Sequence, residues 1–250
     1  EKESLVVNAI GGTSNYQWTR DDNSSWKQTG ASVSIENVTQ DINIFLTAKG
    51  DNGCPTEQAT QSIQFISKPV VTISPEGDKN YCNGDAERLT ASGNGSMSSN
   101  GWSWYIDNVL QDNNTDNIQI TNMTGEHTYS VKGTNTNGCV SDPKSKTLKA
   151  ADEPNLSLSG QNIACRGTKI TITATTTETG ATVVWDGRVQ QTGTGSFTLD
   201  TTLSIAKTYN IAVELTNANG CKTKKTFTIE VKDIPSVTIT NPDGRSSICE

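Results

Sequence analysis

The tripeptide Asn-Gly-Cys occurs three times at a regular interval, ending at Cys54, Cys139 and Cys221. A second class of cysteine and a series of prolines keep the same period of about 81 to 85 residues. The members of these two series are Cys82, Cys165, Cys249, Pro69, Pro154 and Pro235. Three independent landmarks with one period restrict the chain to a tandem array of one kind of domain.

Each repeat presents the same order of features. A proline is followed by a short alternating segment, a cysteine step, a Leu/Ile-rich segment, a segment centred on tryptophan and an alternating segment that ends near Asn-Gly. Alternation indicates half-buried strands, and Asn-Gly favours a tight hairpin because a positive φ costs these residues little. About seven short strands per repeat are typical of an immunoglobulin-like sandwich. The sequence therefore predicts an all-β chain of tandem immunoglobulin-like β-sandwich domains.

The proline junctions place the domain boundaries. We expect repeat 1 at residues 1–67, with its N-terminal strand truncated, repeat 2 at 68–150, repeat 3 at 151–233 and the start of a fourth repeat at 234–250. Each junction is short and contains a proline, which fixes φ. Such linkers are semi-rigid, so the array is predicted to be an extended rod.

One bulky aromatic occupies an equivalent place in each repeat and is expected to anchor its core. These anchors are Trp18, Trp104 and Trp185. Tyr129 and Tyr209, in the penultimate strands, are expected to belong to the same cores, at the place of a tyrosine corner. The first repeat has Ile44 at this place and lacks the corner.

Cysteines at fixed positions of the repeats indicate a disulfide framework made in an oxidising compartment, and the lack of a Cys-x-x-Cys motif argues against zinc. Pairing within repeats joins Cys82 to Cys139 and Cys165 to Cys221, and leaves the outer cysteines to partners elsewhere. Pairing between repeats joins Cys82 to Cys221. The full set is Cys54, Cys82, Cys139, Cys165, Cys221 and Cys249.

Strand topology bears on the choice between these two pairings. The loop between the first two strands of a sandwich lies at the C-terminal pole, and the last hairpin lies at the N-terminal pole. The poles are roughly 20 to 30 Å apart, whereas a disulfide needs Cα atoms within about 7 Å. Poles of adjacent domains face each other, so this geometry favours Cys82–Cys221, although both pairings stay open.

Charge and hydropathy argue against several partners. The net charge of −7 opposes sequence-independent binding to nucleic acid or anionic lipid, since both attract Lys- and Arg-rich surfaces. No run of about 18 apolar residues is present, so no membrane insertion is predicted for this segment. The chain has no initiator Met or signal peptide at Glu1 and stops at Glu250, directly after a cysteine, and we expect it to be a piece of a longer protein.

Residues that would carry chemistry are sparse, and neither an enzyme nor a cofactor is expected. His127, the only histidine, has no accompanying nucleophile motif and is interpreted as a surface residue. Asp112, Asn114 and Asp116 have the alternating oxygen spacing of a calcium loop, but the sixth-position glycine and twelfth-position acid are missing, which favours an Asn/Asp-rich turn. Trp26, in a polar loop, is the candidate for contact with a ligand, namely a sugar ring.

The third repeat carries a nameable pattern between Thr208 and Val231, with Tyr-x-Ile-x-Val, then Thr-Asn-x-Asn-Gly-Cys, then Thr-x-Thr-Ile-x-Val. It resembles a polycystic-kidney-disease (PKD)-like domain. The paired Cys-x-Gly and Asn-Gly-Cys landmarks resemble the repeats of giant surface adhesins of Bacteroidota, including SprB-type gliding adhesins exported by the type IX secretion system. The chain departs from the archetype in the Trp-Asp-x-Gly-Asp-Gly loop, which repeat 2 lacks and of which repeat 3 keeps only Trp185-Asp-Gly.

The resemblance implies a secreted, extracellular, cell-surface protein in which these repeats form a stalk or filament for adhesion or surface motility. The implied partners are neighbouring repeats, surface polysaccharide and the secretion or motility machinery. Asp200-Thr201-Thr202 resembles the Asp-Ser/Thr-x O-glycosylation motif of Bacteroidota, which makes Thr201 the expected glycan carrier. The alternative function is a carbohydrate-binding or accessory module of a secreted hydrolase.

Overall fold

The computed structural model of the chain describes residues 4–11, 14–248 and 250, and every regular element in this part is a β-strand. Within these residues no helix has the length and apolar character needed to cross a membrane. The chain divides into two compact units. One comprises Glu1–Thr72, Ser92–Ser103 and Lys132–Pro143, and the other comprises Ile73–Ala91, Trp104–Val131 and Lys144–Glu250.

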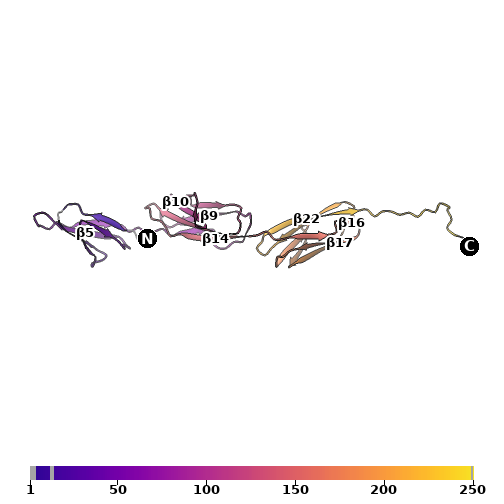
Figure 1. Cartoon of the computed structure of the whole chain (residues 1–250), viewed down its shortest axis with the longest axis horizontal. Helices are drawn as coiled ribbons and strands as arrows, with labels where there is room; N and C mark the ends of the chain where they lie inside the picture. Colours follow the sequence, from indigo (N-terminus) through magenta and orange to yellow (C-terminus); the bar gives the residue numbers. More distant parts are fainter. Residues whose placement is uncertain (1–3, 12–13, 249) are drawn as a thin grey trace. The chain divides into compact units, whose positions relative to one another are not determined.

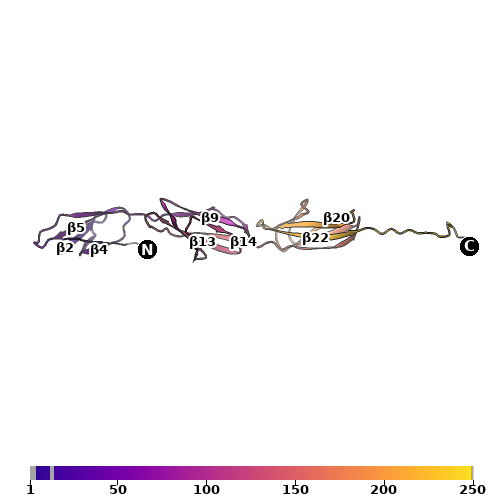
Figure 2. The same cartoon turned by 90° about the horizontal axis from the view of Figure 1, so that it is seen from above.

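The third repeat is a sandwich of a three-stranded and a five-stranded sheet (Figure 1). Its strands are β15 (Ser157–Gly160), β16 (Ile163–Cys165), β17 (Lys169–Thr175), β18 (Ala181–Trp185), β19 (Val189–Gly193), β20 (Ser196–Thr202), β21 (Thr208–Thr216) and β22 (Lys222–Lys232). The sheet orders are β15-β17-β20 and β16-β22-β21-β18-β19, so β20 and β22 belong to different layers (Figure 2). This is an immunoglobulin-like order with the first strand divided between the sheets.

The second repeat has the same topology. Its sheets are β12-β9-β7 and β11-β10-β13-β14-β8. The strands are β7 (Val71–Ser74), β8 (Tyr81–Cys82), β9 (Glu87–Gly93), β10 (Met97–Ile106), β11 (Val109–Leu110), β12 (Asn117–Ile120), β13 (Glu126–Asn135) and β14 (Lys144–Ala151). Four of them, β7, β9, β10 and β13, contain residues of both compact units.

The first repeat contains the later part of the same plan. Its strands are β1 (Leu5–Asn8), β2 (Ser14–Arg20), β3 (Lys27–Thr29), β4 (Ser32–Ile35), β5 (Ile42–Lys49) and β6 (Ala59–Ile63). The sheets are β1-β4 and β3-β2-β5-β6, and counterparts of β7 and β8 do not occur among the described residues. The predicted all-β architecture of tandem immunoglobulin-like sandwiches is confirmed.

A tryptophan lies at the centre of each sandwich. Trp18, Trp104 and Trp185 are only 4%, 0% and 1% exposed. Each indole N–H is hydrogen-bonded to the chain that follows its strand, so these three buried donors are satisfied. The acceptors are the Gly30 carbonyl at 2.8 Å, the Thr115 carbonyl at 3.0 Å and Gln191 Oε1 at 3.2 Å.

The third repeat has a tyrosine corner. Tyr209 donates its hydroxyl to the Ile205 carbonyl at 3.2 Å. Counted back from the Asn-Gly-Cys cysteine, Tyr129 is equivalent to Ile44, while Tyr209 lies two residues further from the hairpin. Tyr129 is instead buried in the second repeat, 4% exposed. Tyr129 therefore lies in the core, and Tyr209 packs partly buried against Ile229 and Val231 while it forms the corner. The two tyrosines differ because the hairpin, and not the Tyr-x-Ile/Val pattern, sets the register.

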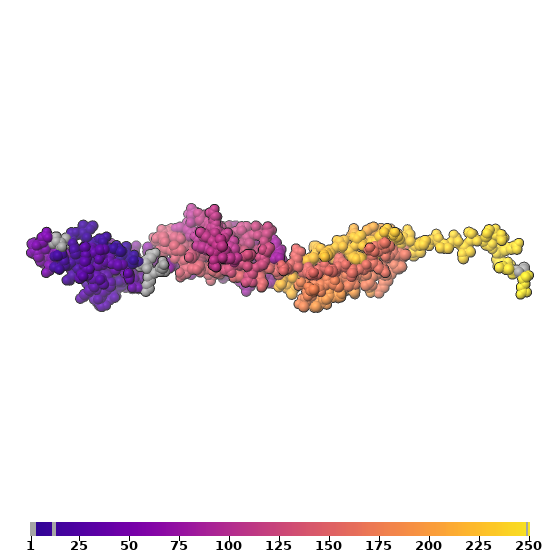
Figure 3. All heavy atoms as spheres, in the orientation of Figure 1, coloured from indigo at the N-terminus to yellow at the C-terminus, as the bar shows by residue number. Residues whose placement is uncertain are grey.

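Residues 234–248 contain no strand. Val237, Ile239 and Ile248 are 88%, 98% and 100% exposed, and Figure 3 shows this segment in yellow as a single file of residues. Uncovered apolar residues of this kind would need a partner sheet to become buried. The start of a fourth repeat stays a prediction.

We expect Gly133→Ala to destabilise the second repeat by about 1 to 3 kcal/mol through overpacking. A Cβ at Gly133, in β13, would lie 2.5 Å from Met97 Cε, 2.9 Å from Trp102 Cζ3 and 3.0 Å from Val71 Cγ1. Gly193→Ala, in β19, is the matched control because a Cβ there meets only the Phe197 ring, at 3.6 Å. Denaturant titration compares the two variants, and equal midpoints would contradict the expectation.

Candidate functional site

The Asn-Gly-Cys hairpin holds its cysteine through an asparagine side chain. Asn217 Oδ1 accepts hydrogen bonds from the backbone N–H groups of Asn219 and Cys221, both at 3.0 Å. The Asn217 N–H in turn donates to the Cys221 carbonyl at 2.9 Å. Gly220 has φ +88°, a conformation that glycine adopts without a steric penalty. Asn217, two residues before the tripeptide, and Gly220 within it therefore fix the cysteine at the tip between β21 and β22.

The Cys-x-Gly step holds the other cysteine at the end of the second repeat. β8 runs parallel to β14, with Cys82 opposite Ala151. The Cys82 N–H donates to Asp85 Oδ2 at 2.8 Å, and the Gly84 N–H donates to the Met123 carbonyl at 2.8 Å. Cys82 is therefore placed where β14 leaves the sandwich.

Cys82 and Cys221 form a disulfide with a Cα separation of 5.5 Å, although they are 139 residues apart in the sequence. The bond joins the second repeat to the third. Cys221 is 1% exposed, and its Sγ lies 3.9 Å from the Tyr81 carbonyl oxygen and 4.0 Å from that of Ala151. Beside it, the Thr223 hydroxyl donates to the Pro154 carbonyl at 2.7 Å.

The alternative of pairing within repeats is wrong for these cysteines. Cys82 lies opposite Ala151, the last residue of β14, whereas Cys139 lies in the hairpin that precedes β14. β14 has eight residues, which span about 26 Å, far more than a disulfide reaches. Cys54, Cys139 and Cys165 are unpaired, and Cys249 lies outside the described residues.

A buried tyrosine lies beside the disulfide. Tyr81 is 2% exposed and donates its hydroxyl to Glu87 Oε2 at 2.9 Å, and Lys79 Nζ is 2.9 Å from the same oxygen. Burial, followed by the hydrogen bond to Glu87, raises the pKa of Tyr81 to about 12. The hydrogen bonds from Lys79 and Tyr81 hold the pKa of Glu87 below its ordinary value.

Ultraviolet titration of the phenols should show one tyrosine ionising with a midpoint of about 12. Because this pKa exceeds the ordinary value of about 10, the stability that Tyr81 contributes is full below about pH 10 and is lost as the pH rises through 12. Tyr81→Phe should remove this last step, and Tyr16→Phe should leave it. A step that persists in Tyr81→Phe would show that another tyrosine produces it.

A groove of about 590 Å³ lies beside Trp26 in the first repeat. Trp26 is half-buried against the core, and the Arg20 guanidinium carbon lies 5.7 Å from its ring centroid. Arg20 is 6% exposed, binds the Asp22 carboxylate through Nε and Nη2, and donates to the Glu36 carbonyl at 3.0 Å. The Arg20 hydrogen bonds lower the pKa of Asp22. Asn23 adds a further polar group to the lining.

His127 lies beside an aspartate at the surface. Its Nδ1 is 2.6 Å from Asp107 Oδ2, and the Thr128 N–H donates to Asp107 Oδ1 at 2.8 Å. The hydrogen bond to His127 is the main cause that lowers the pKa of Asp107. Both side chains are about half exposed, so this is a hydrogen-bonded surface pair at the start of β13.

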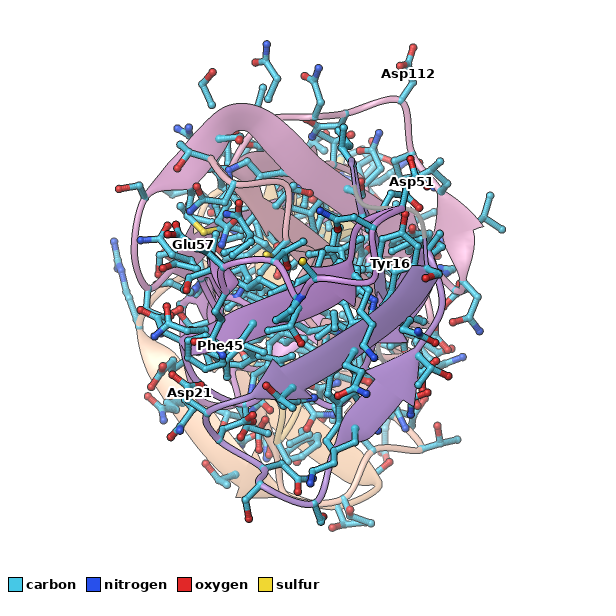
Figure 4. All side chains as sticks on the ribbon, turned by 90° about the vertical axis from the view of Figure 1, so that its left-hand side faces the viewer. Tyr16, Asp21, Phe45, Asp51, Glu57 and Asp112 are labelled. Carbon is cyan, nitrogen blue, oxygen red and sulfur yellow. A yellow bond between two sulfur atoms is a disulfide. The ribbon has the colours of Figure 1, made fainter. Side chains whose placement is uncertain are left out.

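The Asn/Asp-rich segment 112–117 is organised by Asn113. Its Oδ1 accepts from the Thr115 N–H at 3.0 Å, and its Nδ2 donates to the Asn117 carbonyl at 2.7 Å. Figure 4 shows Asp112 on a loop with its carboxylate pointing away from the ribbon. Asp116 Oδ1 accepts from Asn117 Nδ2 at 2.8 Å. Within the described residues no three His, Cys, Asp or Glu side chains are grouped to hold a metal ion.

Thr201 lies within β20, half-buried and opposite Ile170 of β17. The neighbouring Asp200 accepts from the Thr171 hydroxyl at 2.6 Å and from Lys169 Nζ at 2.8 Å. A glycan on Thr201 would leave from near the end of a paired strand. Its modification stays a prediction.

No protein-family model and no curated protein matches the chain. Similar solved structures include the fibronectin(III)-like modules of Clostridium thermocellum CbhA, with a TM-score of 0.37 and 16% identity over 69% of this chain and 100% of that chain. The three N-terminal domains of the highly immunogenic outer capsid protein (Hoc) of bacteriophage RB49 have a TM-score of 0.42 and 12% identity over 94% of this chain and 95% of that chain. The D00-D0 domain of intimin has a TM-score of 0.30 and 12% identity over 64% of this chain and 99% of that chain. Likenesses this distant carry no information on function.

The fold and the junction together define a class of protein. The chain is a tandem array of immunoglobulin-like β-sandwiches in which a disulfide joins one repeat to the next.

Proposed function

We propose that the chain is a force-transmitting segment of a large secreted cell-surface adhesin, a stalk or filament of PKD-like repeats that serves adhesion or surface motility. The observation that carries the proposal is the Cys82–Cys221 disulfide, because it couples two sandwiches that each have their own core. Disulfides persist in oxidising compartments, which supports an extracellular location. The segment acts mechanically and has no catalytic role, with neighbouring repeats and the secretion or motility machinery as its partners.

Adhesion under flow tests this function. Cells that carry Cys82→Ala/Cys221→Ala in the full-length protein should attach normally at rest and detach at lower shear than wild-type cells. His127→Asn, a surface change remote from the disulfide in sequence, is the control. Protease treatment of intact cells should remove the wild-type protein. A protein that is protected inside the cell, or attachment that is unchanged by loss of the whole gene, would refute the proposal.

A second candidate function is binding of surface polysaccharide by the groove beside Trp26. An aromatic ring next to a fixed Arg20–Asp22 pair offers an apolar face and charged hydrogen-bonding groups, the combination that sugar rings require. This site would also serve an accessory module of a secreted hydrolase.

A glycan array would detect this binding. We expect Trp26→Ala to lose at least tenfold in affinity for any bound glycan, because the ring supplies the stacking face. Phe65→Ala is the control, since Phe65 is 42% exposed and is not part of the groove lining. A silent array for the wild-type chain would exclude this second function and leave the mechanical one.

A further inference from the structure

Cys165 is held in the third repeat as Cys82 is held in the second. Each ends a short strand that runs parallel to the last strand of its repeat, with Cys82 opposite Ala151 and Cys165 opposite Lys232. In both repeats the N–H of the next residue donates to that opposite carbonyl at 2.9 Å. Cys165 is exposed and unpaired. The third repeat therefore presents at its end the same half of a junction that Cys82 completes with Cys221.

Cys139 is held in the second repeat as Cys221 is held in the third. Asn135 Oδ1 accepts from the Cys139 N–H at 2.9 Å, and the Asn135 N–H donates to the Cys139 carbonyl at 3.0 Å. Cys139 Sγ lies 3.8 Å from the Ile66 carbonyl oxygen. Ile66 precedes its junction proline by three residues, as Ala151 does, and Ala151 is the residue against which Cys221 lies. Cys139 thus lies against the end of the first repeat without a sulfur partner.

In the first repeat, β6 is the counterpart of the strands beside which the Cys-x-Gly cysteine is held in the later repeats. β14 and β22 each pair with a strand that ends in the Cys-x-Gly cysteine. β6, their counterpart, has β5 as its one neighbour among the described residues. One period before Cys82 this cysteine falls upstream of Glu1. Cys54 belongs to the same series as Cys139, with its N–H bonded to Asn52 Oδ1 at 3.0 Å.

We propose that the repeats are joined by a continuous ladder of disulfides, in which each Cys-x-Gly cysteine bonds to the Asn-Gly-Cys cysteine of the following repeat. Cys165 and Cys249 bond to repeats that follow, and Cys139 and Cys54 bond to repeats that precede. In each step two thiols lose two protons and two electrons to a disulfide of an oxidising protein, which is released as two thiols. The ladder rests on the proposed function in an array of such repeats and names the partners of its unpaired cysteines.

The ladder changes the path that force follows. Tension reaching Cys82 crosses to Cys221 and then follows only about 28 residues to Cys249, which extend to at most about 100 Å. Without the bonds the same path contains about 167 residues and extends to about 550 to 600 Å. The interlocked bonds therefore keep most of every repeat out of the force path, and the array cannot unravel while they hold.

Non-reduced peptide mapping of the full-length protein, released from the cells that make it and alkylated before digestion, tests the ladder. Trypsin places Cys165 in the peptide 150–166 and Cys139 in the peptide 133–144. We expect peptide 150–166 to be linked to a peptide that contains Asn-Gly-Cys, and peptide 133–144 to one that contains Cys-x-Gly. Alkylated free thiols at both positions, or a bond between Cys139 and Cys165, would refute the ladder.

An added repeat provides an independent test on this chain. In a variant with a second copy of residues 153–233 placed after Asp233, Cys165 should bond to Cys221 of the copy, and the count of reactive thiols should show Cys165 fully blocked. Cys165→Ser at the original position only, in the same variant, should free the thiol of the copied Cys221. Cys165 of the copy, which no repeat follows, should stay reactive, whereas reactivity of the original Cys165 in the folded variant would refute the ladder. Neither test depends on whether the protein is an adhesin, so failure of the ladder and failure of the proposed function are distinguishable.

Discussion

Single chains pulled from their two ends should release about 450 to 500 Å less contour length on unfolding when the Cys82–Cys221 bond is present than when it is absent. The bond connects positions 139 residues apart, and the residues between them do not carry the force. Each residue would otherwise add about 3.3 to 3.6 Å. The shielded stretch includes the core tryptophans Trp104 and Trp185.

Optical tweezers would measure this difference between the wild-type chain and Cys82→Ala/Cys221→Ala. The control variant Cys54→Ala/Cys139→Ala removes two unpaired cysteines and keeps the disulfide, so its contour length should equal that of the wild type. If the wild-type chain released as much contour length on unfolding as Cys82→Ala/Cys221→Ala, the two repeats would not be covalently joined in solution.

Trp104→Ala should cost about 3 to 5 kcal/mol in the free energy of unfolding of the second repeat. Trp104 is fully buried, and its indole donates to the Thr115 carbonyl, so the substitution leaves a cavity and an unpaired acceptor. The loss is comparable to the whole stability of a small domain, about 5 kcal/mol at the low end. The second repeat should therefore unfold near room temperature.

Calorimetry separates this local effect from a global one. The first and third repeats have their own buried tryptophans and should keep their transitions. Val109→Ala is the control, because Val109 is 64% exposed in β11 and its removal creates no cavity. Loss of every transition in Trp104→Ala would mean that the repeats fold as one cooperative unit.

The sequence by itself determined the architecture, because that information is local and repeated. Apolar alternation specifies strands, Asn-Gly specifies the hairpin, and a period shared by cysteines and prolines specifies repeated domains. Burial of Trp104 follows from the same pattern, since a large ring within an alternating segment has one apolar face to occupy.

The register of residues within the strands was harder to predict from the sequence than the architecture. Tyr129 and Tyr209 share a local pattern but differ by two residues relative to the hairpin, a shift that keeps both on the same face. Alternation alone cannot detect such a shift. Only the hydrogen bond from Tyr209 to the Ile205 carbonyl distinguishes the corner from the core position.

The tertiary structure alone decided between the two disulfide pairings and assembled the groove around Trp26. Both pairings are compatible with the common period of the two cysteine series. Only Cys82 and Cys221 come within bonding distance, because β8 ends where β14 leaves its sandwich. Likewise Arg20 and Glu36 meet beside Trp26 because β2 and β4 bring them there. Covalent and polar partners are chosen by distances of a few ångströms, and those distances depend on how strands far apart in the chain pair and pack.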